Sequence, residues 1–118
     1  MAVLTPPSSF QRARVGERAE ITRIKAAVAK VYGISVAAMD GSRGNEAVVH
    51  ARHVAMWCAR QFTVATWAEI GRRFGGRSPS SAAAAVKHLV YIDRDHAMIR
   101  AIERRLGLEG YDTTKYEG

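Results

Sequence analysis

Apolar side chains at helical spacing, cut short at intervals by glycine, most constrain what this chain can fold into. Between residues 17 and 32, Ile21, Ile24 and Val28 recur every three or four positions, and Gly33 follows as a stop signal. The same spacing returns in later segments, and we find no alternating run typical of a β-hairpin. The sequence therefore predicts an all-α fold, a compact helical bundle.

Cap residues divide the rest of the chain into short helices. Thr66 can cap a helix, and Glu69 three positions later completes a capping box. Ser78 followed by Pro79 indicates another helix start, because proline is favoured at the first helical position. The helices that we predict span residues 17–32, 34–40, 45–62, 67–74, 79–90 and 93–106.

We expect a single folded domain with two loose ends. The 118 residues fit one domain of the usual size, about 100–150 residues. Residues 1–16 contain two adjacent prolines and two arginines, and we expect a flexible basic N-terminal arm. Residues 17–107 are predicted to form the domain, and residues 108–118 a frayed C-terminal tail.

Positive charge is the first indication of function. The chain has 18 Lys and Arg against 11 Asp and Glu, a net charge of +7. Residues 41–90 hold seven basic and two acidic side chains, whereas residues 91–118 hold five basic and six acidic ones. This balance favours a polyanion such as nucleic acid, although a merely soluble basic surface gives the same composition. The excess of positive charge lies in residues 1–90.

Other function classes find little support in the sequence. No run of about 18 apolar residues predicts a membrane span, and the N-terminus lacks the apolar core of a signal peptide. The single cysteine, Cys58, cannot form an internal disulfide, so we expect a cytoplasmic, nucleoid-associated protein. His50 and His53 have no third ligand nearby in sequence for a metal. No nucleophile motif and no nucleotide-binding loop occur, so we expect neither an enzyme nor a cofactor.

Residues 66–90 suggest a binding function. A short helix, a tight turn at Gly75-Gly76-Arg77 and a second helix that starts with small polar residues describe a helix-turn-helix. The alanine run at residues 82–85 allows close approach either to bases or to a partner helix. Glycine turns between helices also occur in ordinary bundles, so this pattern alone leaves both interpretations open.

Longer motifs narrow the choice. The runs IKAAVAKVYGIS, ARHVAMWCARQFT and AEIGRRFGGR, the last followed by a serine-rich helix start, occur in this order. From residue 21 to about 106 the chain thereby resembles the C-terminal DNA-binding domain of DnaA, the bacterial chromosomal replication initiator. The resemblance covers roughly three-quarters of the chain and implies a helix-turn-helix that binds double-stranded DNA. We expect a stand-alone version of this module, without a counterpart of the initiator's ATPase domain.

The resemblance also implies a set of DNA contacts. Arg52 and Arg60 match phosphate-contacting positions, and Gly44 stands where the family has a minor-groove arginine, with Arg43 beside it. Trp67 matches a backbone-contacting position, although we expect its ring to pack mainly in the core. The candidate DNA-binding residues are Arg43, Arg52, His53, Arg60, Thr66, Trp67, Ala68, Arg73, Arg77, Ser78, Ser80, Ser81 and Lys87.

The second helix departs from the family pattern. Where the family has Asp-His-Ser/Thr-Thr-Val, residues 78–82 read Ser-Pro-Ser-Ser-Ala, and Ala84 replaces a later histidine. Each good base contact is worth about 1–3 kcal/mol, so this loss predicts altered or relaxed sequence specificity.

Two functions fit this pattern. One is a transcription or replication regulator, with RNA polymerase, a DNA-bending protein or replication-initiation regulators as candidate partners. The alternative is a protein-interaction module that mimics the initiator's last domain and binds regulators instead of DNA.

Overall fold

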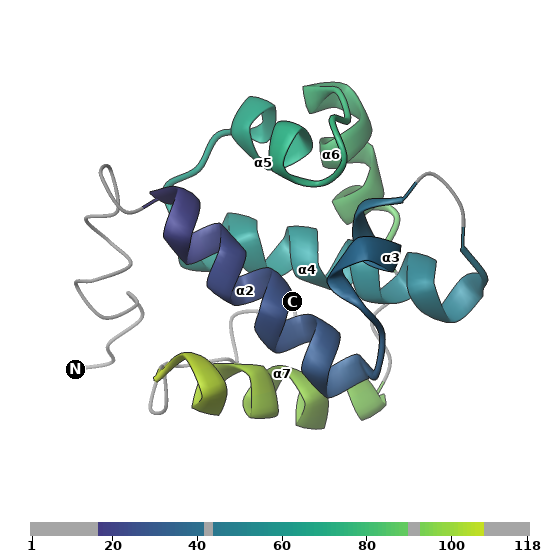
Figure 1. Cartoon of the computed structure of the whole chain (residues 1–118), viewed down its shortest axis with the longest axis vertical. Helices are drawn as coiled ribbons and strands as arrows, with labels where there is room; N and C mark the ends of the chain where they lie inside the picture. The colour runs from purple at the N-terminus through teal and green to yellow at the C-terminus, as the bar shows by residue number, and fades with distance from the viewer. Residues whose placement is uncertain (1–16, 42–43, 90–92, 108–118) are drawn as a thin grey trace.

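The computed structural model describes residues 17–41, 44–89 and 93–107, and the elements in these ranges are helical (Figure 1). Over these residues the all-α class predicted from the sequence is confirmed. The helices are α2 (Glu17–Tyr32), α3 (Val36–Asp40), α4 (Glu46–Phe62), α5 (Trp67–Arg73), α6 (Pro79–Lys87) and α7 (Asp93–Leu106).

Side-chain caps fix where four of these helices begin. The side-chain oxygens of Ser35, Asn45, Thr66 and Ser78 each accept a hydrogen bond from the backbone N–H three residues on, at 3.0–3.1 Å. Such caps satisfy N–H groups that have no partner inside the helix. The predicted starts are therefore correct to within two residues. The end predicted for α6 at residue 90 is wrong, because the helix stops at Lys87, and residue 90 itself lies outside the described residues.

Helix α4 forms the centre of the hydrophobic core. Its buried side chains are Ala51, Arg52, Val54, Ala55, Met56, Cys58, Ala59 and Phe62. Phe62 meets Phe74 from the end of α5 and Ile21 from α2 in one cluster that also includes Ile102 of α7. Cys58 is a small buried hydrophobe as expected, and burial raises the pKa of its thiol.

The other helices surround α4. In Figure 1, α5 and α6 lie at one end of the molecule and α7 at the opposite end, with α2 packed beside α4 between them. No helix in the described ranges is long and apolar enough to cross a membrane.

A buried carboxylate fastens α7 to the bundle. Asp95 is fully buried, and its Oδ1 accepts a hydrogen bond from the Tyr32 hydroxyl at 2.6 Å. The same oxygen lies 3.0 Å from Nε2 of His50 on α4. A buried charge is tolerated only when it has such partners. These contacts join α2, α4 and α7. The sequence did not predict them, since it raised His50 only as a candidate metal ligand that lacked a third ligand nearby.

A second buried carboxylate makes the stability of the fold depend on pH. Glu103 on α7 is 4% exposed, and its Oε2 has no hydrogen-bond partner. Burial raises its pKa from 4.5 to about 7, although Arg100 and Arg104 act in the opposite direction. Since the folded pKa is raised, the stabilisation from the bound proton is complete below about pH 4.5 and is lost as the pH rises through about 7.

Glu103→Gln should remove this dependence. We expect the free energy of unfolding of the variant, relative to the wild type, to rise by about 2 kcal/mol between pH 5 and pH 8. Urea denaturation at both pH values measures the free energy of unfolding of each protein. The contribution from histidine titration is the same in both proteins and cancels when their free energies are subtracted. Parallel pH profiles for the two proteins would contradict the assignment to Glu103.

Candidate nucleic-acid interface

Helices α5 and α6 form the predicted helix-turn-helix. Gly75 and Gly76 in the turn have φ values of 79° and 73°, a conformation that glycine adopts without strain. A Cβ on Gly71 would lie 2.2 Å from the carbonyl oxygen of Arg77, whose N–H donates to the Gly71 carbonyl at 2.7 Å. Only a glycine lets the end of α5 and the start of α6 approach this closely.

The turn also docks on the end of α3. A Cβ on Gly75 would lie 2.2 Å from the carbonyl oxygen of Asp40. The Arg77 guanidinium donates to the Gly41 carbonyl at 2.7 Å and to the Phe74 carbonyl at 2.5 Å. Arg77 thus holds the helix-turn-helix against Gly41, at the end of α3. The phosphate contact expected for this half-buried arginine stays a prediction.

Arg52 lies inside the protein. It is 5% exposed, and its Nε donates to the Met39 carbonyl at 2.7 Å while Nη2 donates to the Gly41 carbonyl at 3.1 Å. Burial lowers its pKa, and the nearby charge of Arg77 lowers it further. The structure therefore gives Arg52 a positioning role at the end of α3. The phosphate contact that the resemblance implies for it stays a prediction.

Lys25 is a component of the site that sequence reasoning missed. It is 7% exposed, and its Nζ lies 2.7 and 2.9 Å from the two carboxylate oxygens of Asp40. The same ammonium donates to the Arg73 carbonyl at 2.5 Å and lies 5.0 Å from the centre of the Phe74 ring. The available signal was its position four residues after Ile21, on the apolar face of the first helix.

The loop before α4 differs from the family where the minor-groove arginine is expected. Gly44 has a φ of 154°, and a Cβ there would lie 2.8 Å from Cγ1 of Val48. A side chain at this position therefore requires the loop to rearrange. Arg43, the neighbouring candidate, lies outside the described residues.

Candidate residues near the start of α5 are held by local contacts. The exposed Arg60 stacks 4.7 Å from the centre of the Trp67 ring and donates to the Ala65 carbonyl at 3.2 Å. Trp67 is half-buried and packs against the core, as expected, whereas Thr66 and Ala68 are exposed. This cluster keeps a guanidinium beside the first turn of α5.

The two arginines at the end of α5 contact other side chains of the protein. Arg73 is half-buried, and its Nη2 donates to the Thr22 hydroxyl at 2.7 Å. Arg72 forms an ion pair with Glu69, which also lies 3.9 Å from Arg73. The side chain of Glu69 thus pairs with these arginines, while its backbone N–H donates to the Thr66 hydroxyl that caps the helix. Arg73 is a less accessible phosphate ligand than the sequence suggested.

Helix α6 presents the exposed part of the candidate interface. Ser80, Ala84 and Lys87 are exposed and follow each other at intervals of four and three residues, which places them on one helix face. Ser81 is exposed beside them. The Ser78 hydroxyl is used as the helix cap.

His53 is half-buried on α4, which packs against α6. Burial lowers its pKa, and the charges of Arg52, His50, Arg77 and His88 lower it further. These effects favour the neutral form of the His53 ring.

Comparison with known proteins identifies similar sequences. The family model described as "Bacterial dnaA protein helix-turn-helix" matches residues 21–89. The chromosomal replication initiator protein DnaA of Caulobacter vibrioides strain NA1000 is 42% identical over 77 residues, which is 64% of this chain and 16% of the relative. DnaA of Xanthobacter autotrophicus is 37% identical over 109 residues, 90% of this chain and 20% of the relative. The chain spans no more than a fifth of these relatives, and no solved structure matches it.

The two turn glycines offer a matched test of the docking between the turn and α3. Alanine at either position meets the same strain of about 1–2 kcal/mol from a positive φ. Only Gly75→Ala also clashes with the Asp40 carbonyl, since no atom lies within 4 Å of a Cβ on Gly76. We expect Gly75→Ala to lose about 2 kcal/mol more stability than Gly76→Ala in urea denaturation. Equal losses would show that the turn is not held against α3.

Proposed function

Since this chain belongs to the bacterial DnaA helix-turn-helix family, we propose that it is a regulatory protein that binds double-stranded DNA with altered or relaxed sequence specificity. The family is one of DNA-binding domains, and its match to residues 21–89 supports DNA binding by this chain. In this proposal the protein acts at the nucleoid in the cytoplasm, by binding rather than by catalysis, and needs no cofactor.

The exposed face of α6 is the observation that carries the proposal. Ser80, Ser81 and Ala84 are small, so the helix backbone can approach the floor of the major groove. A serine hydroxyl both donates and accepts hydrogen bonds and therefore accepts several bases, whereas an alanine methyl suits the methyl group of thymine. Without long side chains that make two bonds to one base, this face supports weak discrimination between sequences.

Affinity then depends on contacts to phosphates, which read no sequence. Lys87 and Arg60 are exposed at the end of α6 and beside the start of α5. The Gly41 carbonyl, where the loop before α4 begins, accepts hydrogen bonds from both Arg52 and Arg77. That loop carries Arg43 in the sequence. We propose that Arg43 contacts the duplex next to α6.

Partners would supply the selectivity that α6 lacks. RNA polymerase, a DNA-bending protein or a replication-initiation regulator bound nearby would add contacts or favour a deformed site. The proposal covers both transcription and replication control.

The rival function is a protein-interaction module. The observation in its favour is the small-residue character of α6, where Ala84 is exposed and serines replace charged or aromatic base readers. A partner helix can pack closely on such a surface. The test below separates this function from DNA binding.

Lys87→Ala tests DNA binding, and Lys87→Arg is its matched control because it keeps the charge. If Lys87 contacts a phosphate, the slope of log affinity against log salt should become less steep by about one unit in Lys87→Ala and stay unchanged in Lys87→Arg. Fluorescence anisotropy with a random duplex and an initiator-box duplex measures the slope and the preference together. Arg52→Ala is a poor probe, since it removes a buried contact to the end of α3.

We expect salt-sensitive binding of both duplexes with less than about a tenfold preference for the box, in line with the missing base contacts. A strong preference for the box would contradict relaxed specificity while leaving DNA binding intact. No binding of either duplex at low salt would refute DNA binding and favour the protein-interaction module.

A further inference from the structure

Among the described side chains of α7, the arginines are exposed and the carboxylates are buried. Residues 91–118 hold more acidic than basic side chains. In the described part of α7, however, Asp95 and Glu103 are buried at 0% and 4% exposure. Arg100, Arg104 and Arg105 are exposed on the same helix. The described part of α7 thus exposes three arginines and buries two carboxylates.

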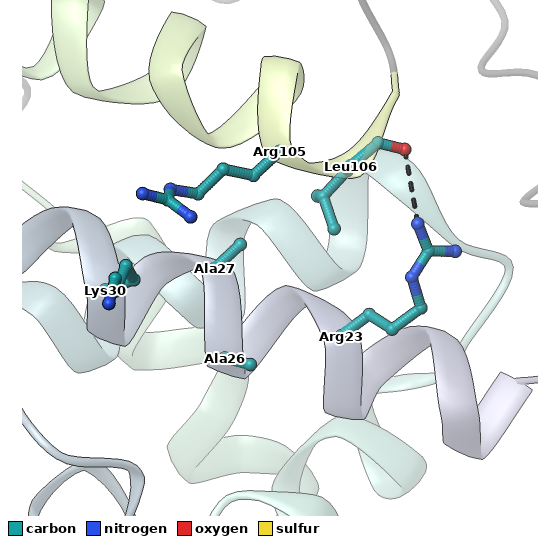
Figure 2. Close-up of a pocket in the computed structure, with 6 residues that line it drawn as sticks. All are labelled: Arg23, Ala26, Ala27, Lys30, Arg105 and Leu106. Carbon is teal, nitrogen blue, oxygen red and sulfur yellow. Dashed lines mark hydrogen bonds between the residues drawn. The ribbon is translucent and has the colours of Figure 1, made fainter.

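This basic surface borders a groove between α2 and α7. The groove has a volume of about 360 Å³ and is lined by Arg23, Ala26, Ala27, Lys30, Arg105 and Leu106. Figure 2 shows Arg105 running along the space between the two helices, while Lys30 and Arg23 mark the two ends of the groove on α2. None of these six residues is acidic, and Arg23 pairs with Glu20, so Lys30 and Arg105 give the groove its positive field.

Arg23 is held in place at one end of this groove. Its Nη1 lies 3.1 Å from Oε1 of Glu20, which is 8% exposed, and its Nη2 donates to the Leu106 carbonyl at 3.4 Å. The contact ties the end of α7 to α2. Lys30 and Arg105 are exposed, so their charges face the solvent.

The groove is separate from the helix-turn-helix. In Figure 1, α7 lies at the opposite end of the molecule from α5 and α6. The lining residues belong to α2 and α7 and include none of the candidate DNA-binding residues. A ligand in this groove would therefore leave the exposed face of α6 accessible.

We propose that the α2–α7 groove binds the phosphate backbone of a second DNA duplex, so that one molecule bridges two DNA segments. The bridging rests on the proposed function, because α6 holds the first duplex. Arg23 and Lys30 are seven residues apart, about 10 Å along the helix, which spans about three phosphates of one strand. Arg100 and Arg104 are two further exposed cations on α7.

An acidic protein is the competing occupant. Protein interfaces centre on a few Trp, Tyr or Arg anchors buried in well-packed, desolvated pockets. The apolar lining here consists of two alanines and one leucine, which provide little for such an anchor. Three long cations around a small apolar floor match a phosphate backbone better, because backbone contacts need charge and no deep pocket.

A two-duplex capture assay tests the proposal. Short duplexes of about 20 base pairs are immobilised, the full chain is added, and recovery of a labelled second duplex is measured; such a length is too short to wrap around the protein. The double variant Lys30→Gln/Arg105→Gln should recover about fivefold less labelled duplex than the wild type, since it loses two phosphate contacts. The control Lys30→Arg/Arg105→Lys keeps both charges and should match the wild type. Both residues are exposed, so neither change is expected to unfold the protein.

The outcomes separate the two proposals. If the wild-type protein is retained on the immobilised duplex but recovers no labelled duplex, the second site is overturned and the proposed function is left intact. Failure to retain the protein at all overturns both proposals. Equal recovery by wild type and the glutamine variant overturns the groove assignment, and would arise if a dimer bridged through two α6 helices. A labelled polyglutamate peptide that binds in place of the duplex also overturns it, in favour of an acidic protein partner.

Discussion

Three cations gather at the carbonyl end of α3, and the arrangement of the candidate interface depends on them. Lys25 binds the Asp40 carboxylate, while Arg52 and Arg77 both donate to the Gly41 carbonyl. Lys25 and Arg52 are less than a tenth exposed, so removing one partner would leave a buried polar group without a bond, at a cost of about 1–3 kcal/mol or more. The cations come from α2, α4 and the turn before α6, which makes this corner the junction of the fold.

This junction holds together two segments that are distant in sequence, the end of α3 and the turn between α5 and α6. Arg77 and the close approach of Gly75 to Asp40 hold the turn of the helix-turn-helix against the end of α3. Lys25 adds a bond to the Arg73 carbonyl at the end of α5. Gly41 and the turn before α6 are therefore positioned by the same buried contacts. A protein that contacts two parts of a duplex needs this kind of rigidity, because each displaced contact loses its share of the binding energy.

Local signals in the sequence sufficed for the helices and for part of the interface. The hydroxyls of Thr66 and Ser78 cap helices as predicted, because a cap depends only on residues three positions away. The burial of Arg52 and Lys25 could not be predicted in the same way. A long basic side chain can reach solvent or turn inward to a carbonyl, and only the tertiary neighbours decide. Asp95 illustrates the same limit, since its partners Tyr32 and His50 come from two other helices.

Charge counted along the chain is accordingly a poor guide to charge on the surface. On the helix-turn-helix side, Arg52 and Arg77 are engaged by backbone carbonyls and Arg73 by a threonine hydroxyl, which leaves fewer exposed cations than the sequence suggests. On α7 the two acidic side chains that the structure describes, Asp95 and Glu103, are buried. If the proposed function holds, a face with few base readers and few exposed cations would bind one duplex weakly. A second contact on another face would then raise occupancy through effective concentration, without any gain in the affinity of α6 itself.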